Sequence, residues 1–123
     1  IAAGRQTELF LGNLDAVRDW GYAPEYVEGM WLMLQHDEPT DFVLATGIGH
    51  TVRDFVRFAF ARLGMNWEDF VRYDQRYTRP TEVDALIGDP SKARELLGWK
   101  ANTLTPELAE IMVDFECQLE SAL

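Results

Sequence analysis

The stretch from Arg76 to Asp84 gathers side chains suited to holding a nucleoside diphosphate. It reads Arg-Tyr-Thr-Arg-Pro-Thr-Glu-Val-Asp, with guanidinium groups at Arg76 and Arg79 and a carboxylate at Glu82. A guanidinium fork matches two phosphate oxygens at once, and a carboxylate can accept hydrogen bonds from ribose hydroxyls. Pro80 would stiffen the segment beside Arg79. On residue types alone, a diphosphate site and a solvated charged loop are equally good interpretations.

Arg18 is a second candidate for contact with a phosphate. It begins the tetrapeptide Arg-Asp-Trp-Gly, which lies between a short apolar run and a segment with helical spacing. The alternative is an ion pair between Arg18 and a nearby surface acid, which stabilises a protein by only about 0 to 1 kcal/mol. Spacing alone favours the ion pair, and both interpretations stay open.

A glycine turn at residues 46–52 has part of a dinucleotide-binding fingerprint. The sequence Thr-Gly-Ile-Gly-His-Thr-Val would join a strand to a capped helix, which is the setting of that fingerprint. Val52 stands in place of the third glycine, so the close packing of helix on strand is lost. We therefore interpret Gly47 and Gly49 as turn residues and predict no cofactor site here.

The sequence contains none of the catalytic or metal-binding motifs that we searched for. None of the four tyrosines has a lysine four residues later, so the acid–base pair of many nicotinamide-dependent reductases is not here. No Ser-His-acid or Cys-His set is evident, and His36, His50 and Cys117 are too scattered for a zinc site. We expect no catalytic and no metal-ligating residue in these 123 residues.

Overall charge and composition narrow the class of protein. The net charge of -10 argues against a nucleic-acid partner, because binding phosphate backbones draws on clustered Lys and Arg. No apolar run approaches the roughly 18 residues of a membrane span, and residues 1–6 lack the pattern of a signal peptide. The single Cys117 cannot form an internal disulfide. A cytoplasmic protein without a membrane anchor is the expectation.

Short strands alternate with helices in the pattern that must position these residues. Apolar runs predict strands at residues 9–11, 42–45, 70–73 and 85–87. Helices are predicted from Ala23, from a capping pair at Thr51 and Asp54, after Pro90, and from Thr105. Together they favour a small α/β unit with about four helices and a sheet too small to be complete.

The first of these helices has a clear apolar face. Its positions recur with three-and-four spacing, which predicts that this face packs into the core. The residues concerned are Ala23, Tyr26, Val27, Met30, Trp31 and Leu34. We likewise expect Trp20, Trp31 and Trp99 to be core residues.

Residues 11–21, 76–84 and 86–99, taken in this order, closely resemble segments of the GDP-mannose 4,6-dehydratase family. The Gly-Asn-Leu-Asp turn leading into Arg-Asp-Trp-Gly is the most specific cue, whereas residues 86–99 are shared among extended short-chain dehydrogenase/reductases. The resemblance covers nearly the whole chain. It implies that residues 1–123 are the C-terminal substrate-binding portion of an NADP-dependent lyase, without its Rossmann half.

The resemblance also implies what the whole enzyme does and which residues of this chain bind substrate. The family converts GDP-mannose to GDP-4-keto-6-deoxymannose, a step toward GDP-fucose, with NADP and the catalytic residues held by the N-terminal portion. A cytoplasmic homo-oligomer is expected. The implied substrate-binding residues are Arg18 and Arg79 at the diphosphate, Glu82 at the ribose, Tyr77 beside them, and the backbone near Leu9 and Leu11 at the guanine.

The chain departs from many relatives at Tyr22, Glu25, Thr78 and Thr81, whereas the candidate arginines and Glu82 are spared. Three alternatives remain at this point. In the first, the chain is a stand-alone GDP-sugar-binding or regulatory module. In the second, it is a fragment of the related GDP-4-keto-6-deoxymannose reductase. In a third, structural interpretation, the acidic last helix mediates oligomer contacts and the arginines are incidental.

Overall fold

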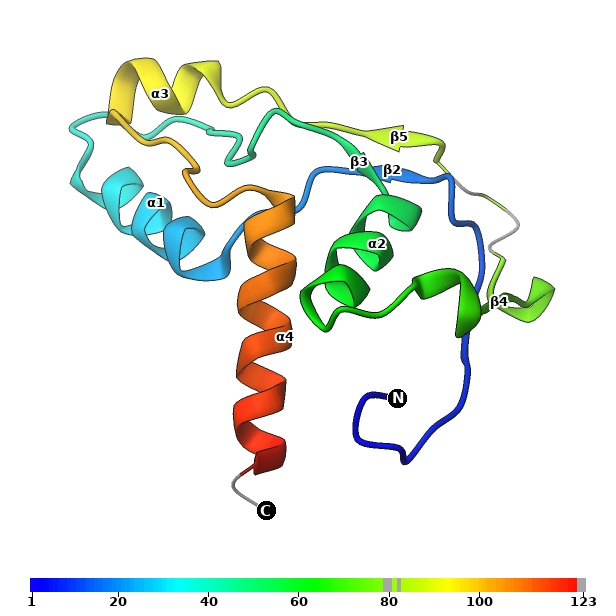
Figure 1. The fold of residues 1–123 in the computed structure, drawn as a ribbon. Helices are drawn as coiled ribbons and strands as arrows, with labels where there is room; N and C mark the ends of the chain where they lie inside the picture. The colour runs from blue at the N-terminus through cyan, green and yellow to red at the C-terminus, as the bar shows by residue number, and fades with distance from the viewer. Residues whose placement is uncertain (79–80, 82, 122–123) are drawn as a thin grey trace.

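The computed structural model describes residues 1–78, 81 and 83–121, and in it short strands alternate with helices (Figure 1). The strands are β1 (Leu9–Leu11), β2 (Val17–Arg18), β3 (His50–Thr51), β4 (Val71–Tyr73) and β5 (Ala85–Leu86). The helices are α1 (Ala23–Gln35), α2 (Val52–Arg62), α3 (Ser91–Leu97) and α4 (Thr105–Ser121). Single 3-10 turns at Trp67–Asp69 and Gln75–Tyr77 flank β4. This arrangement confirms the small α/β unit with four helices.

The described strands form two small sheets rather than one. Strand β1 pairs in parallel with β4, so that Leu9 lies opposite Val71 and Leu11 opposite Tyr73. Strand β2 lies at the centre of the other sheet, antiparallel to β3 and parallel to β5. Because β2 is central, its two residues are fixed from both sides.

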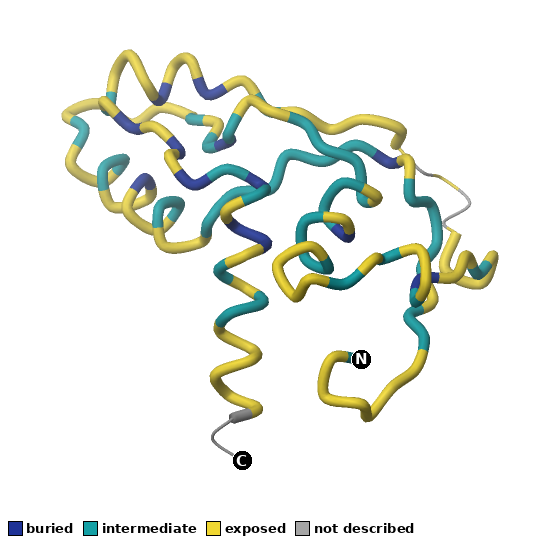
Figure 2. The backbone as a smooth tube through the Cα atoms, in the orientation of Figure 1, coloured by how far each residue is buried: buried dark blue, intermediate teal, exposed yellow. Residues whose placement is uncertain are grey.

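A small core lies between α1, α3 and the chain that leads into α4. Its buried members are Ala93, Trp99 and Ala101, and the indole of Trp99 donates to the carbonyl oxygen of Glu25 at 2.8 Å. Figure 2 shows the buried backbone concentrated where α3, this connection and the first turns of α4 come together. The prediction that Trp99 is a core residue is confirmed, since it is 3% exposed.

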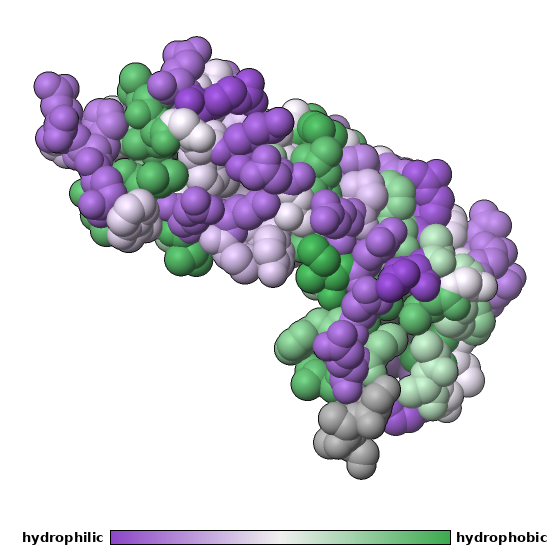
Figure 3. All heavy atoms as spheres, turned by 60° about the vertical axis from the view of Figure 1, so that its left-hand side comes forward, coloured by the Kyte–Doolittle hydropathy of each residue, from purple (hydrophilic) through white to green (hydrophobic). Residues whose placement is uncertain are grey.

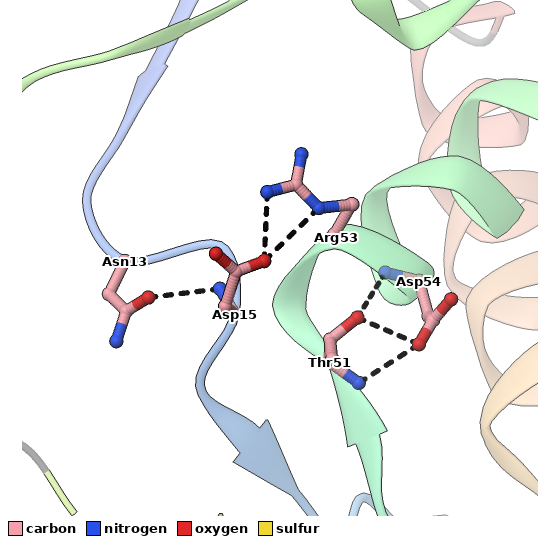
Figure 4. A network of polar contacts seen from close by, with 5 residues as sticks. All are labelled: Asn13, Asp15, Thr51, Arg53 and Asp54. Atoms are coloured by element: carbon pink, nitrogen blue, oxygen red, sulfur yellow. Dashed lines mark hydrogen bonds and ion pairs between the residues drawn. The ribbon is translucent and has the colours of Figure 1, made fainter. Parts of the chain in front are cut away.

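Helix α2 fixes the turn that follows β1. Thr51 and Asp54 form the predicted capping box, in which the Thr51 hydroxyl accepts from Asp54 N at 3.0 Å and Asp54 Oδ2 accepts from Thr51 N at 3.1 Å (Figure 4). The first N–H groups of α2 donate to the carbonyl oxygens of Leu14 and Ala16. Arg53 adds an ion pair with Asp15 at 2.8 Å (Figure 4). A locally specified helix start therefore holds residues 14–16.

Two predictions about the apolar segments are wrong. Residues 42–45 form no strand, although their side chains alternate between the core and other surroundings. Most of the predicted inner face of α1 is turned outward, since Trp31 is 59% exposed and Leu34 is 82% exposed, whereas Tyr26 packs on the core as predicted. The periodicity correctly located a helix with one apolar side, but it could not tell whether that side meets this core or a surface outside it.

Candidate functional site

A pocket of about 230 Å³ brings three of the predicted substrate-binding residues together. Leu11, Arg18 and Tyr77 contribute to its lining, although they come from β1, β2 and the turn after β4. The remaining lining residues are Gly12, Asn13, Ala16 and Val52. Leu9 lies two residues earlier in β1 and does not line this pocket. Arg79 and Glu82, together with Pro80, lie outside the described residues.

One wall of the pocket is formed by β1 and the turn that follows it. Leu9 N donates to the carbonyl oxygen of Phe70, and the carbonyl oxygen of Leu11 accepts from Asp74 N at 2.8 Å. Asn13 then closes the turn, because its Oδ1 accepts from Asp15 N at 2.9 Å (Figure 4). This backbone pairing fixes the position of Leu11 at the pocket wall.

Gly12 allows the turn to approach the segment that carries Tyr77. A Cβ at position 12 would clash with the carbonyl oxygen of Tyr77 and would lie 2.7 Å from its carbonyl carbon. Any larger residue must therefore push these two backbone segments apart. No local pattern predicts this contact, because Gly12 and Tyr77 are far apart in the chain.

The side chain of Arg18 reaches from β2, the central strand of the three-stranded sheet, to the segment before β5. Its guanidinium donates to the carbonyl oxygen of Val17 at 2.7 Å and to that of Val83 at 2.8 Å. These contacts tie Arg18 to the chain directly after Glu82, while the same side chain lines the pocket. Two main-chain acceptors therefore help to hold the Arg18 guanidinium in place.

Arg76, the other arginine of the 76–84 segment, pairs with a carboxylate of this chain. Its guanidinium forms a two-point pair with Asp74, with Nη2 2.6 Å from Oδ2 and Nε 3.1 Å from Oδ1. Hydrogen bonds from the side chain and backbone of Arg76 lower the pKa of Asp74. Arg76 does not line the pocket, although it precedes Tyr77 in the same 3-10 turn.

Asp19 is the residue at this site that sequence reasoning missed. Its carboxylate accepts from Thr46 N and Oγ1, from Gly47 N and from Gly88 N, at distances between 2.5 and 3.2 Å. Burial by itself would raise the pKa of Asp19, but these four hydrogen bonds outweigh it and lower the pKa. Asp19 therefore anchors the turn before β3 and the chain after β5 to the strand that carries Arg18.

The lowered pKa of Asp19 predicts a pH-dependent contribution to stability. Because the folded-state pKa lies below the ordinary 3.8, the contribution is present above that value and is lost as pH falls through the folded-state pKa. Asp19→Asn should lower the melting temperature at neutral pH, since its amide group faces N–H donors; such a mismatch costs roughly 1–3 kcal/mol. The difference in melting temperature should narrow as pH falls through about 3.8 and close only below the folded-state pKa. A gap that stays constant down to pH 2 would contradict this role.

The glycine turn at residues 46–49 does not fit a nicotinamide cofactor. Gly49 is packed against two side chains, since a Cβ there would lie 2.6 Å from both Ile87 Cδ1 and Val17 Cγ1. The chain then enters β3, which is antiparallel to β2, in contrast to the parallel strands of the dinucleotide fold. Gly47 has a φ of 79°, as a turn residue requires. Within the described part of the chain, these residues serve the backbone.

Comparison with known proteins identifies sequence relatives over nearly the whole chain. A family model described as "GDP-mannose 4,6 dehydratase" matches residues 1–112. GDP-mannose 4,6 dehydratase 2 of Arabidopsis thaliana is 56% identical over 119 residues, which are 97% of this chain and 32% of the relative. GDP-mannose 4,6 dehydratase of Homo sapiens is 48% identical over 132 residues, with 93% and 36% covered. The chain spans about a third of the length of these curated relatives.

Solved structures share the fold at much lower identity. UDP-glucose-4-epimerase from Stenotrophomonas maltophila, solved with bound NAD and formylated UDP-arabinopyranose, superposes with a TM-score of 0.81 at 22% identity. The alignment covers 99% of this chain and 38% of that structure. Among the described residues of this chain, no helix is long and apolar enough to span a bilayer. The fold is thus one that recurs as about a third of a larger structure.

Proposed function

This chain belongs to the GDP-mannose 4,6-dehydratase family, and we propose that it supplies the part of such an enzyme that holds the GDP moiety of GDP-mannose. The observation that carries the proposal is the pocket lined by Leu11, Arg18 and Tyr77, three residues to which the family resemblance assigns substrate binding. An arginine, a phenol and exposed main chain are groups suited to a nucleoside diphosphate.

In this proposal each part of GDP meets a different element. Arg18 and Arg79 contact the diphosphate, and Glu82 accepts hydrogen bonds from the ribose. The guanine lies along the edge of β1 that faces away from β4. Leu9 N and the carbonyl oxygen of Leu11 already bond on the β4 side, so the peptide groups of Phe10 point to that other edge. Backbone donors and acceptors there can pair with the base.

In this proposal the catalytic steps are carried out by the part of the full-length protein that lies outside these residues. In the full-length protein, which we expect to be a cytoplasmic homo-oligomer, NADP is held outside residues 1–123. When bound, NADP accepts and returns a hydride at the sugar, and elimination of water gives GDP-4-keto-6-deoxymannose. The described residues of this chain bind and orient the nucleotide. The 56% identity to a dehydratase favours this reaction over that of the related reductase.

Turnover by residues 1–123 alone tests this division of labour. We expect the purified chain neither to bind NADP tightly nor to release the 4-keto sugar from GDP-mannose, because it contains no glycine fingerprint that fits the cofactor and no tyrosine–lysine pair. The full-length protein should do both under the same conditions. Product formed by the chain, after removal of every trace of full-length enzyme, would refute the proposal.

A further inference from the structure

A second pocket, of about 650 Å³, lies between the turn before β3, the start of α3 and the chain that leads into α4. It shares no lining residue with the nucleotide pocket. Sites for small molecules commonly have volumes of roughly 300 to 1,000 Å³. Figure 3, in which the end of the molecule with α1 and α3 comes forward, shows hydrophilic side chains there among smaller apolar patches. The volume of the second pocket is therefore that of a site for a small molecule.

Two carboxylates hold the walls of this pocket in place. Asp19 ties the turn at residues 46–47 to Gly88, because its oxygens accept hydrogen bonds from both. Glu25 accepts from Asn102 N at 3.1 Å and thereby fixes the chain that leads into α4. The backbone around the pocket is thus held in position without a ligand, which lowers the cost of binding one.

Arg94 and Lys100 line the pocket as cations without an acceptor in the described part of the chain. Neither forms a hydrogen bond or an ion pair with a described residue. Every other described lysine or arginine donates to a carboxylate or a carbonyl oxygen of this chain. In a chain with a net charge of -10, two such cations at one pocket mark a place that favours an anion.

Asp89 and Asn102 give the same pocket groups that suit hydroxyls. Hydrogen bonds from Ser91, together with the nearby charge of Arg94, lower the pKa of Asp89. Asp89 is therefore a carboxylate at neutral pH, which accepts hydrogen bonds from hydroxyl groups. The side-chain amide of Asn102 forms no hydrogen bond with a described residue and can both donate and accept. The lining thus suits a ligand that combines an anionic group with hydroxyl groups.

We propose that this pocket binds a phosphate monoester of a sugar. Arg94 and Lys100 hold the phosphate, whose charge of about -2 at neutral pH matches their two positive charges. The guanidinium takes two phosphate oxygens at once, and the ammonium acts as a point charge. Asp89 and Asn102 bond to hydroxyls of the sugar, which fills the space that a bare phosphate would leave empty. The inference does not depend on the proposed nucleotide site, because the two pockets have separate linings.

Calorimetry on the full-length protein tests the site with glucose 6-phosphate as the probe. GDP and NADP are present at saturating concentrations, so that the proposed nucleotide sites are filled. We expect glucose 6-phosphate to bind with a Kd of about 1 mM or tighter, inorganic phosphate to bind more weakly, and glucose not to bind. Absence of binding by glucose 6-phosphate would overturn the proposal. Binding no tighter than that of inorganic phosphate would overturn it as well.

Three single substitutions test whether the probe binds at this pocket. Arg94→Gln and Lys100→Gln should each weaken binding of glucose 6-phosphate about tenfold or more. Lys92→Gln is the matched control, since Lys92 lies in α3 with Arg94 but donates to Thr40 Oγ1 at 2.6 Å and does not line the pocket. Melting curves exclude unfolding, and GDP affinity should stay at the wild-type level in all three variants. If Arg94→Gln and Lys100→Gln bind the probe like wild type, or if Lys92→Gln loses as much affinity, the proposed site is wrong.

Discussion

Replacing Arg79 with alanine in the full-length protein should weaken GDP-mannose binding by about ten- to a hundredfold. A hydrogen bond from a guanidinium to a charged phosphate contributes roughly 1.5 to 3 kcal/mol, and its loss corresponds to that change in affinity. NADP binding should hardly change, because the proposed cofactor site lies outside residues 1–123. Arg79→Lys should recover only part of the affinity, since an ammonium keeps the charge but not the planar fork.

Arg76 provides the matched control, because it is an arginine in the same segment that is paired with Asp74 and does not line the pocket. Arg76→Ala should bind GDP nearly as wild type does. Calorimetry at two salt concentrations measures GDP affinity, and a melting curve for each variant excludes unfolding. If Arg79→Ala folds normally and binds GDP like wild type, or if Arg76→Ala loses as much affinity, the proposed diphosphate site is wrong.

Gly12→Ala should both destabilise the protein and impair the proposed nucleotide pocket. The added methyl group would overlap the backbone at Tyr77, where no side-chain rotation can relieve the clash. Overpacking of this kind costs about 1–3 kcal/mol, and it should displace Tyr77 from the pocket wall. We expect a lower melting temperature and a clear loss of GDP affinity measured well below that temperature.

Gly4→Ala is the control for Gly12→Ala. A Cβ at Gly4 meets nothing within 4 Å, and Gly4 does not line the pocket. Its φ of 74° still makes the substitution unfavourable, so some stability is lost there as well. GDP affinity should nevertheless stay at the wild-type level. An unchanged affinity in Gly12→Ala would show that the close approach to Tyr77 does not shape the site.

The elements that sequence reasoning located correctly are those with local causes. The start of α2 depends on Thr51 and Asp54, three residues apart, and its end on Gly64 with a φ of 67°. Strand β1 is a short apolar run closed by a turn, and Asn13 closes that turn with its own side chain. Such interactions are complete within a few residues, so the local pattern contains them.

The predictions that failed depend on partners far away in the chain or outside it. The role of Asp19 could not be read from the tetrapeptide that contains it, because its donors are Thr46, Gly47 and Gly88. The periodicity located an apolar face on α1, but it does not say whether that face turns toward this core.

The hydrogen bonds around β2 also bear on the order in which the chain folds. Asp19 bonds to residues 27 and 69 positions away, and Arg18 bonds to Val83, 65 positions away. Contacts of such long sequence separation require large loops to close, and they form late relative to helices stabilised by neighbours. The capped α2 can therefore form early, whereas the pocket wall that Arg18 provides exists only once β3 and β5 have paired with β2. A partly folded chain can therefore begin α2 before the pocket that Arg18 lines exists.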